Sequence, residues 1–333
     1  MRCVLTMALL LTAASGFAGD GVLIARPEAY KTLVNPDCSH CRDEATRRAA
    51  ELRDDDRVLC WIRGYSDGGA IPLRFFLNSY RVISDSYGVF VYDPDAGYAR
   101  GFAPSYDFTF YGWRNGVMVM KHKDGTLYSC LTGVAFDGPR KGDRLEAVPT
   151  LMSDWGFWLE RYPGNVAYHM FDKYQPLAIA RTVNKDSQES RGPADKRRPA
   201  NAEVLGVFEE GKARAYSLDL LAKSRMIEET ADGHSRIVLW YAPTKTAAAF
   251  RPVASPPGEG NEGETRDLTL QMDSADPTSP FVDKETGSHW DIAGRAVEGE
   301  LKGWTLQWLD GTQVKWFAWA AEYPETTIYE THE

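Results

Sequence analysis

The 333-residue chain is short of basic residues. Lysine and arginine together number 38, against 47 aspartates and glutamates, which leaves a formal net charge of −9. Nucleic-acid-binding proteins present basic faces to the phosphate backbone, so this balance argues against nucleic acid as a partner. An acidic surface is explained more simply by solubility.

The chain also lacks long hydrophobic runs. A short apolar run, Val4 to Ala14, follows Arg2 and precedes a small-residue site ending at Ala18. This order is typical of a secretory signal and predicts removal of residues 1–18, with a retained anchor as the alternative. Because no later stretch is apolar enough to cross a bilayer, we expect an exported protein, periplasmic or extracellular, without a transmembrane segment.

Cysteine and histidine are scarce, with five and six residues respectively. The histidines form no ligand pattern, and a metal site needs three or four converging ligands, so no cofactor is expected. Cys60 and Cys130 lie in apolar surroundings that are typical of inert buried thiols. The motifs of a nucleophile elbow, a phosphate loop and a zinc-protease helix are also missing.

Two other cysteines, Cys38 and Cys41, form a Cys-x-x-Cys motif within the N-terminal segment, residues 19–56. Strong helix formers follow from Arg42 to Leu52, so the motif is predicted to open a helix, whose dipole lowers a thiol pKa. Three interpretations stay open: a local disulfide, a thiol redox site, and a metal site of Cys38, His40 and Cys41. The segment is too short for a thioredoxin domain.

A tryptophan-rich pattern is written twice. Residues 133–163 and 294–324 share three glycines, an alanine, two tryptophans, a tyrosine and a proline, at positions that are always 161 apart. The shared part Trp-x-x-Trp-x-x-x-Tyr places three rings on one face of a helix, and a proline then stops the helix. Helical spacing favours core packing of these rings over a sugar-binding platform.

Many short strand patterns and few helix patterns predict a β-rich α+β fold that is present twice, as two similar tandem domains, each closed by a tryptophan helix. Asn115-Gly116 predicts a hairpin turn. Polar residues 185–199, with two prolines, are expected to be extended or mobile. The predicted division is a first repeat at residues 57–172, a linker at 173–201 and a second repeat at 202–330.

Three aspartates near the predicted turns, Asp85, Asp93 and Asp95, could bind calcium. They lack the spacing and the glycine of a calcium-binding loop. Solvated turn carboxylates are therefore the preferred interpretation.

Four further segments carry a resemblance to a known family. They are Ala70-Ile71-Pro72-Leu73, Asn78 to Asp85, Leu131-Thr132-Gly133 and Asp283-Lys284-Glu285-Thr286-Gly287-Ser288. Together they resemble the bacterial exported proteins known as domain of unknown function 3179, over residues 57–172 and again over 202–329. The resemblance implies bacterial export but no established activity.

The resemblance also implies a Cys-Pro-Leu-Cys turn and a histidine, which would suit a soft metal or a redox centre. The residues at the cysteine positions are Asp93 and Ala96 in the first repeat and Ala242 and Lys245 in the second, and those at the histidine position are Tyr80 and Ser224. Neither repeat can build such a centre in the usual way. Cys38 and Cys41 could supply thiols from outside the repeats.

The sequence therefore predicts a non-catalytic binding or assembly module whose partner is an exported protein or an envelope component. The alternative is a thiol-disulfide or metal-dependent redox protein that uses Cys38 and Cys41. A carbohydrate-active protein is a third class. Exposed aromatic side chains on a concave surface would favour binding, and a cleft holding both cysteines and a histidine would favour redox chemistry.

Overall fold

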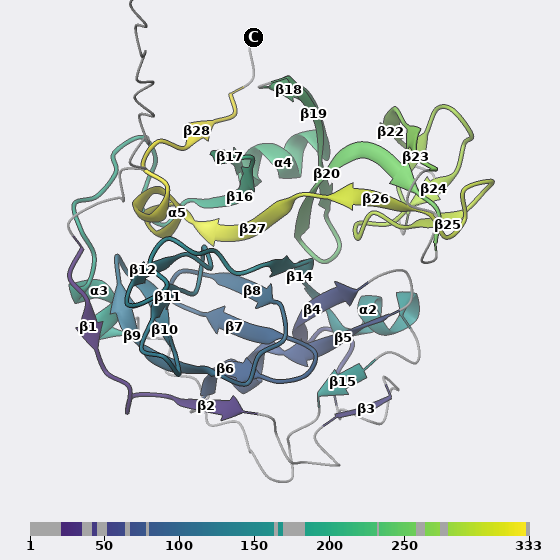
Figure 1. Cartoon of the computed structure of the whole chain (residues 1–333). Helices are drawn as coiled ribbons and strands as arrows, with labels where there is room; N and C mark the ends of the chain where they lie inside the picture. The colour runs from purple at the N-terminus through teal and green to yellow at the C-terminus, as the bar shows by residue number, and fades with distance from the viewer. Residues whose placement is uncertain are drawn as a thin grey trace, which may run out of the picture.

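A computed structural model shows an α+β, β-rich protein, as the sequence predicted. The structure describes residues 21–34, 42–44, 52–63, 67–77, 80–162, 166–168, 184–231, 233–257, 264–273 and 279–330. We call residues 52–168 the first half and residues 203–330 the second half. Figure 1 shows the second half, in green and yellow, stacked on the first half, in blue.

Three five-stranded sheets include the strands of the first half. Sheet 1 has the order β14-β4-β5-β15-β3, formed by Thr150–Asp154, Arg57–Arg63, Asp67–Pro72, Val166–Tyr168 and Arg42–Glu44. Sheet 2 has the order β13-β8-β7-β6-β2, formed by Ala147–Val148, Tyr98–Phe102, Val89–Asp93, Tyr80–Ser84 and Lys31–Val34. Sheet 3 has the order β1-β9-β10-β11-β12, formed by Ile24–Ala25, Phe108–Arg114, Val117–His122, Leu127–Ser129 and Ala135–Asp137.

Three further sheets form the second half. Sheet 4 has the order β27-β16-β17-β28, formed by Asp310–Lys315, Glu203–Glu209, Lys212–Ser217 and Thr327–Ile328. Sheet 5 has the order β18-β19-β20-β21, with β26 also on β20, formed by Met226–Ala231, His234–Tyr241, Thr246–Ser255, Arg266–Asp267 and Thr305–Trp308. Sheet 6 has the order β22-β23-β24-β25, formed by Leu270–Met272, Phe281–Asp283, His289–Trp290 and Ala296–Glu298.

The strand order of the first half recurs in the second. The path β14-β4-β5-β15 of sheet 1 matches β27-β16-β17-β28 of sheet 4, and the final pair is parallel in both. The helices α1 (Leu73–Phe76) and α4 (Leu218–Ser224) follow β5 and β17, while α2 (Trp155–Arg161) and α5 (Trp316–Glu322) follow β14 and β27. The boundaries of the two repeats stay a prediction.

The tryptophans of α2 and α5 lie in the core, as their spacing predicted. Trp155 and Trp158 are each 1% exposed, Trp316 is fully buried, and Trp319 is 2% exposed. Buried rings cannot present a platform to a sugar, so these rows do not support the carbohydrate interpretation. Burying such large apolar surfaces stabilises the ends of both halves.

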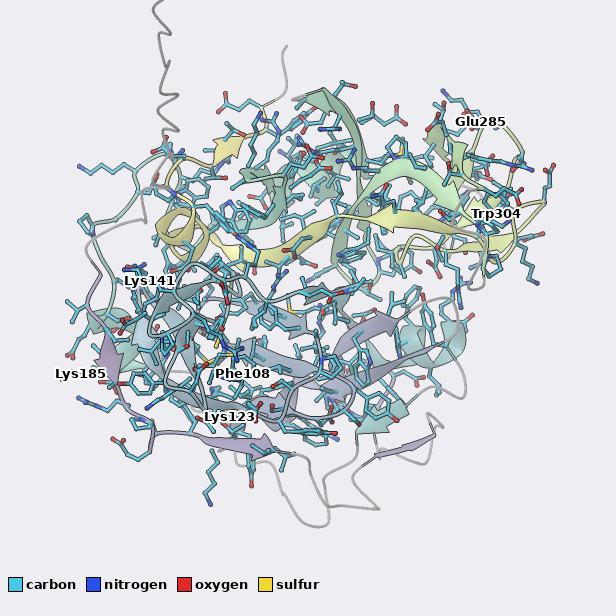
Figure 2. All side chains as sticks on the ribbon, in the orientation of Figure 1. Phe108, Lys123, Lys141, Lys185, Glu285 and Trp304 are labelled. Atoms are coloured by element: carbon cyan, nitrogen blue, oxygen red, sulfur yellow. The ribbon has the colours of Figure 1, made fainter. Side chains whose placement is uncertain are left out.

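The two halves share their cores. Trp316 and Phe317 of α5 pack with residues of sheets 2 and 3, and Leu151 of the first half packs with sheets 5 and 6. Backbone contacts cross the same boundary, because the Lys315 N–H donates to the Ala96 carbonyl at 2.8 Å. Figure 2 shows side chains filling the space between the halves.

Two local predictions were wrong. The helix expected from Arg42 does not begin there, because Arg42–Glu44 forms β3 and pairs with β15. Polar residues 185–199 are not wholly extended, because Lys185–Glu189 forms α3, whose N-cap Asn184 accepts from two backbone amides of the first turn. In the first case strand pairing overrides helix propensity, and in the second a capping residue starts a short helix in a polar stretch.

No helix in the described part of the chain is both long and apolar enough to span a membrane.

Candidate functional site

The predicted thiol site cannot be placed. Cys38, His40 and Cys41 lie outside the described residues. Cys60 and Cys130 are free and buried, as their apolar surroundings predicted, and burial raises the pKa of both thiols well above its usual value. A thiol that holds its proton is a poor nucleophile, so neither of these two is a reactive centre.

Asp93, which the sequence resemblance implied to stand at a cysteine position, is a buried turn carboxylate rather than a solvated one. One of its oxygens accepts from the backbone N–H groups of Asp95 and Ala96 at 3.0 and 3.1 Å, and the other accepts from Met118 at 3.2 Å. Burial raises the pKa of Asp93 to about 6. Asp85, also buried, closes the preceding turn in a similar way by accepting from Tyr87 at 2.8 Å.

Metal ligands do not converge in the part of the chain that the structure describes: no group of three or more His, Cys, Asp or Glu side chains could hold an ion there. Asp95 is tied instead to the backbone of Asn184, whose N–H donates to it at 3.1 Å. These contacts give the aspartates a structural role in turns.

Strand register gives its own correspondence between the β7–β8 turn of the first half and the β19–β20 turn of the second half. Each turn has four residues, between the pairs Asp93–Tyr98 and Tyr241–Thr246. Counted from these pairs, Asp93 corresponds to Tyr241 and Ala96 corresponds to Thr244. When the prolines of the two turns are matched instead, Asp93 corresponds to Ala242 and Ala96 to Lys245.

The two residues that the sequence resemblance implied to stand at a histidine position lie elsewhere. Tyr80 begins β6, and Ser224 ends α4, where its hydroxyl donates to the Leu220 carbonyl at 3.0 Å.

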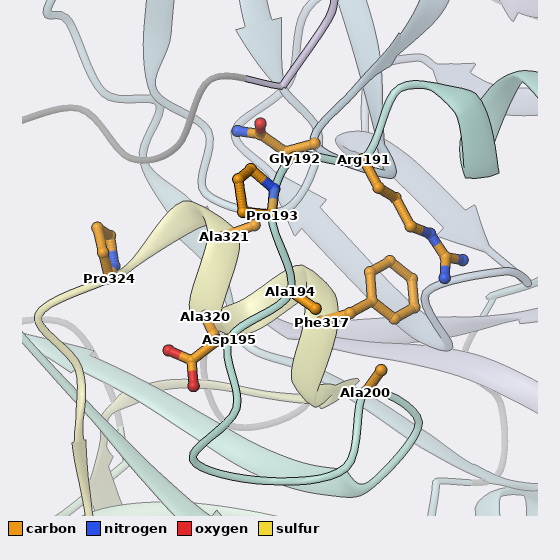
Figure 3. Close-up of a pocket in the computed structure, with 11 residues that line it drawn as sticks. Arg191, Gly192, Pro193, Ala194, Asp195, Ala200, Phe317, Ala320, Ala321 and Pro324 are labelled. Atoms are coloured by element: carbon orange, nitrogen blue, oxygen red, sulfur yellow. The ribbon is translucent and has the colours of Figure 1, made fainter.

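A pocket of about 270 Å³ lies between α5 and residues 191–200, the segment that follows α3 (Figure 3). Its lining is mostly small and apolar, with three polar side chains. The lining residues are Asn115, Arg191, Gly192, Pro193, Ala194, Asp195, Ala200, Phe317, Ala320, Ala321 and Pro324.

The first wall of the pocket is the β9–β10 turn, which the Asn115-Gly116 pair correctly predicted. Both residues have positive φ, 58° and 75°, as a two-residue hairpin turn of this type requires. The Gly116 N–H donates to the Ser190 hydroxyl at 2.9 Å, and the Ser187 hydroxyl donates to the Gly116 carbonyl at 3.2 Å. Both serines are fully buried, so α3 fixes this wall.

The opposite wall is held by Arg197. Its guanidinium donates to the carbonyls of Pro324 and Thr326 at 2.8 and 2.7 Å, beyond the end of α5. Arg197 also donates to both oxygens of Asp195, and this hydrogen bonding lowers the pKa of the carboxyl. Asp195 is therefore a paired anion, although it lines the pocket.

Arg191 is the cation that can act on a ligand. Its guanidinium lies 3.6 Å from the centre of the Phe317 ring, which Figure 3 shows facing it, and no described carboxylate forms an ion pair with it. Burial lowers its pKa. Nearby Asn115 is 2% exposed, and its side-chain oxygen accepts from no described residue. The pocket thus combines apolar walls with a half-buried cation.

Sequence reasoning missed this site because residues 191–200 have the composition of a linker. The sequence does contain the partners of this contact, which are the Asn-Gly turn and two later serines, Ser187 within α3 and Ser190 at its C-cap. Their contact spans about 70 residues of sequence, so no local pattern could reveal it.

Comparison with known families gives one match. The family described as Protein of unknown function (DUF3179) matches residues 111–326, which is more than half of the chain and includes every residue that lines the pocket. No curated protein and no solved structure matches the chain.

Proposed function

We propose that this chain, which belongs to the DUF3179 family, is an exported, non-catalytic binding protein. In this proposal the pocket beside α5 binds a small ligand that joins an apolar body to a carboxylate. The export part rests on the signal-like residues 1–18, and the partner would be met in the periplasm or outside the cell. Two copies of one domain, at 57–172 and 202–330, belong to the same proposal and are supported by the recurring strand order.

The observation that carries the proposal is the state of Arg191. Asp95 and Asp93 act on Arg191 through their charge, but no described carboxylate forms an ion pair with it. A guanidinium that is half-buried on an aromatic ring and has no such ion pair favours a planar anion such as a carboxylate. Asp195 does not satisfy Arg191, because Arg197 already pairs with it. The apolar part of the ligand would lie against Ala320 and Ala321, where burial of apolar area contributes to affinity.

Calorimetric titration with phenylacetate and with its neutral isostere phenylacetamide tests this function. For a ligand of this size we expect a Kd on the order of 1 mM for the acid and at least about ten-fold weaker binding of the amide. Arg191→Ala should weaken phenylacetate binding by at least about ten-fold. Arg191→Lys should retain part of it, because the charge stays but the planar stacking is lost.

Arg266→Ala is the matched control. Arg266 also lies over an aromatic ring, that of Trp304 at 5.1 Å, but far from the pocket lining. It should bind phenylacetate like the wild type. Equal binding of acid and amide, or full binding by Arg191→Ala, would show that the pocket does not recognise an anion. Ala194→Trp, which fills the pocket, then distinguishes an apolar pocket from binding elsewhere.

A further inference from the structure

Strand β18 has an open edge in the described structure, whereas the corresponding strand of the first half does not. In sheet 2, β6 is covered by β2, which comes from the N-terminal segment and runs parallel to it. In sheet 5, β18 occupies the same end of the path β26-β20-β19-β18, and no described strand pairs with its outer side. The edge position that β2 fills is therefore open on β18.

Register shows which residues face this edge. The Trp240 N–H donates to the Arg225 carbonyl, so Ile227 and Glu229 continue that hydrogen-bonded ladder with β19. Met226, Glu228 and Thr230 consequently turn their amide and carbonyl groups outward. The β6 residues that pair with β2, Val82 and Ser84, occupy the positions of Met226 and Glu228.

β2 shows what an added strand does at such an edge. Leu33 inserts into the core and is 6% exposed, while Thr32 accepts from the Phe110 N–H at 2.7 Å. On β18 the matching inner residue is Ile227, 6% exposed, beside α4. An incoming strand with an apolar residue at the position of Leu33 would extend this smaller core in the same way.

The charge at the edge indicates the occupant. Glu228 is exposed, and no ion pair to it is found among the described residues. Two copies of β18 that paired antiparallel through their outward-facing residues, from Met226 to Thr230, would place Glu228 opposite its own copy, which is destabilising. A groove of about 290 Å³, lined in part by Glu228, Thr230 and Thr269, adjoins the edge and has room for a long side chain.

We propose that the edge of β18 binds an extended segment of a partner protein, parallel to β18, with a lysine or arginine beside Glu228. Main-chain hydrogen bonds from Met226, Glu228 and Thr230 would give affinity, and the charge pair would select the partner. This surface is separate from the pocket at α5, and the proposal does not depend on the pocket.

A synthetic peptide of alternating valine and lysine tests the proposal on the full-length protein. Bound peptide should slow hydrogen exchange of the Glu228 and Thr230 amides by at least about ten-fold. The amides of Ile227 and Glu229, already paired with β19, should change little. A peptide of alternating valine and glutamate should protect none of the four.

Substitutions complete the test. Glu228→Lys should reverse the preference, so that the glutamate peptide protects the edge and the lysine peptide does not. Glu298→Lys, at the one exposed residue of the edge strand β25, is the matched control and should keep the original preference. Glu228→Pro removes an outward N–H without touching the β19 ladder and should abolish protection by either peptide.

Protection by the lysine peptide that persists in Glu228→Pro would overturn the proposal, as would equal protection by both peptides. Concentration-dependent dimerisation that protects the same amides without peptide would identify a second copy as the occupant and would overturn it as well.

Discussion

Two equivalent strand positions hold glycine in the first half and arginine in the second half. In the first half, Gly69 and Gly88 leave room for rings, because a Cβ on them would lie 2.0 Å from Trp61 and 2.8 Å from Phe90. In the second half, strand register places Arg214 and Arg236 at these positions. One strand order thus accommodates an aromatic core or a buried ionic network.

The ionic network is compact and well paired. Arg236, whose side chain is 4% exposed, lies 2.6 Å from Glu209 and 3.6 Å from Glu229. Arg214 contacts Glu229 at 2.7 Å, and the Tyr216 hydroxyl donates to the same carboxylate. In the ionic network, attraction between opposite charges offsets the free-energy cost of removing them from water. In the first half, burial of the apolar rings stabilises the fold directly. The shared strand arrangement therefore fixes where these side chains lie, but it does not fix whether they are apolar or charged.

The largest expected effect tests how alike the closing helices are. Trp158→Ala and Trp319→Ala should each destabilise the protein by about 3–5 kcal/mol, because both rings are buried. Substitution of each tryptophan by phenylalanine should reveal a difference in stability between the two helices. The Trp319 indole N–H donates to the Thr326 hydroxyl at 2.9 Å, while that of Trp158 has no partner among the described residues. Trp319→Phe should therefore cost about 1 kcal/mol more than Trp158→Phe in urea unfolding. Equal costs would contradict this difference.

The next effect concerns the ionic network. Glu209→Gln leaves the buried Arg236 without its main counter-charge and should cost about 3 kcal/mol or more. The double variant Glu209→Leu with Arg236→Met should lie much closer to the wild type, because it removes both charges and keeps apolar volume. Chemical denaturation of the single and double variants measures the difference. A double variant that is as unstable as the single one would show that the network is needed as a whole.

A smaller effect concerns pH and the turn at Asp93. The folded pKa of about 6 lies above the ordinary value of 3.8, so the folded protein binds the extra proton between these values. Stability contributed by protonated Asp93 is full below about pH 4 and is lost as pH rises through about 6, by up to about 3 kcal/mol. Asp93→Asn keeps an acceptor for Asp95 and Ala96 but not for Met118, which costs a fixed amount. Its deficit against the wild type should shrink between pH 4 and 6.5 in urea titrations, and parallel curves would refute the shift.

The smallest effect compares the β7–β8 and β19–β20 turns at their last residue. Gly97 has φ 74°, and the corresponding Lys245 has φ 51°, a left-handed conformation that costs a side chain about 1 kcal/mol. Gly97→Ala should therefore destabilise by about 1 kcal/mol. Lys245→Gly should stay within about 0.5 kcal/mol of the wild type, because relief of strain offsets the larger entropy of the unfolded chain. Thermal unfolding resolves both, and a clear loss in Lys245→Gly would show that its side chain matters more than its backbone.

Local patterns predicted the local features well. Ring spacing placed Trp155, Trp158, Trp316 and Trp319 in the core, and Asn115-Gly116 fixed a hairpin. Strand pairing between distant segments could not be predicted, because the same alternation suits any partner of similar length. The pocket was missed for the same reason, since its wall depends on Arg197 reaching the carbonyls of Pro324 and Thr326.

Hydrogen bonds between the halves limit which truncated forms of the protein can fold. Lys315 bonds to the Ala96 carbonyl and Arg57 to the Thr244 carbonyl, so each half completes a turn of the other. A premature stop after the first half would leave its apolar residues around Phe110 and Trp113 without the cover of α5. We therefore expect that neither half expressed alone folds, that the whole chain unfolds in one calorimetric step, and that co-expression of the two fragments restores a soluble complex. Two separate melting transitions would show instead that the second half can be lost without consequence for the first.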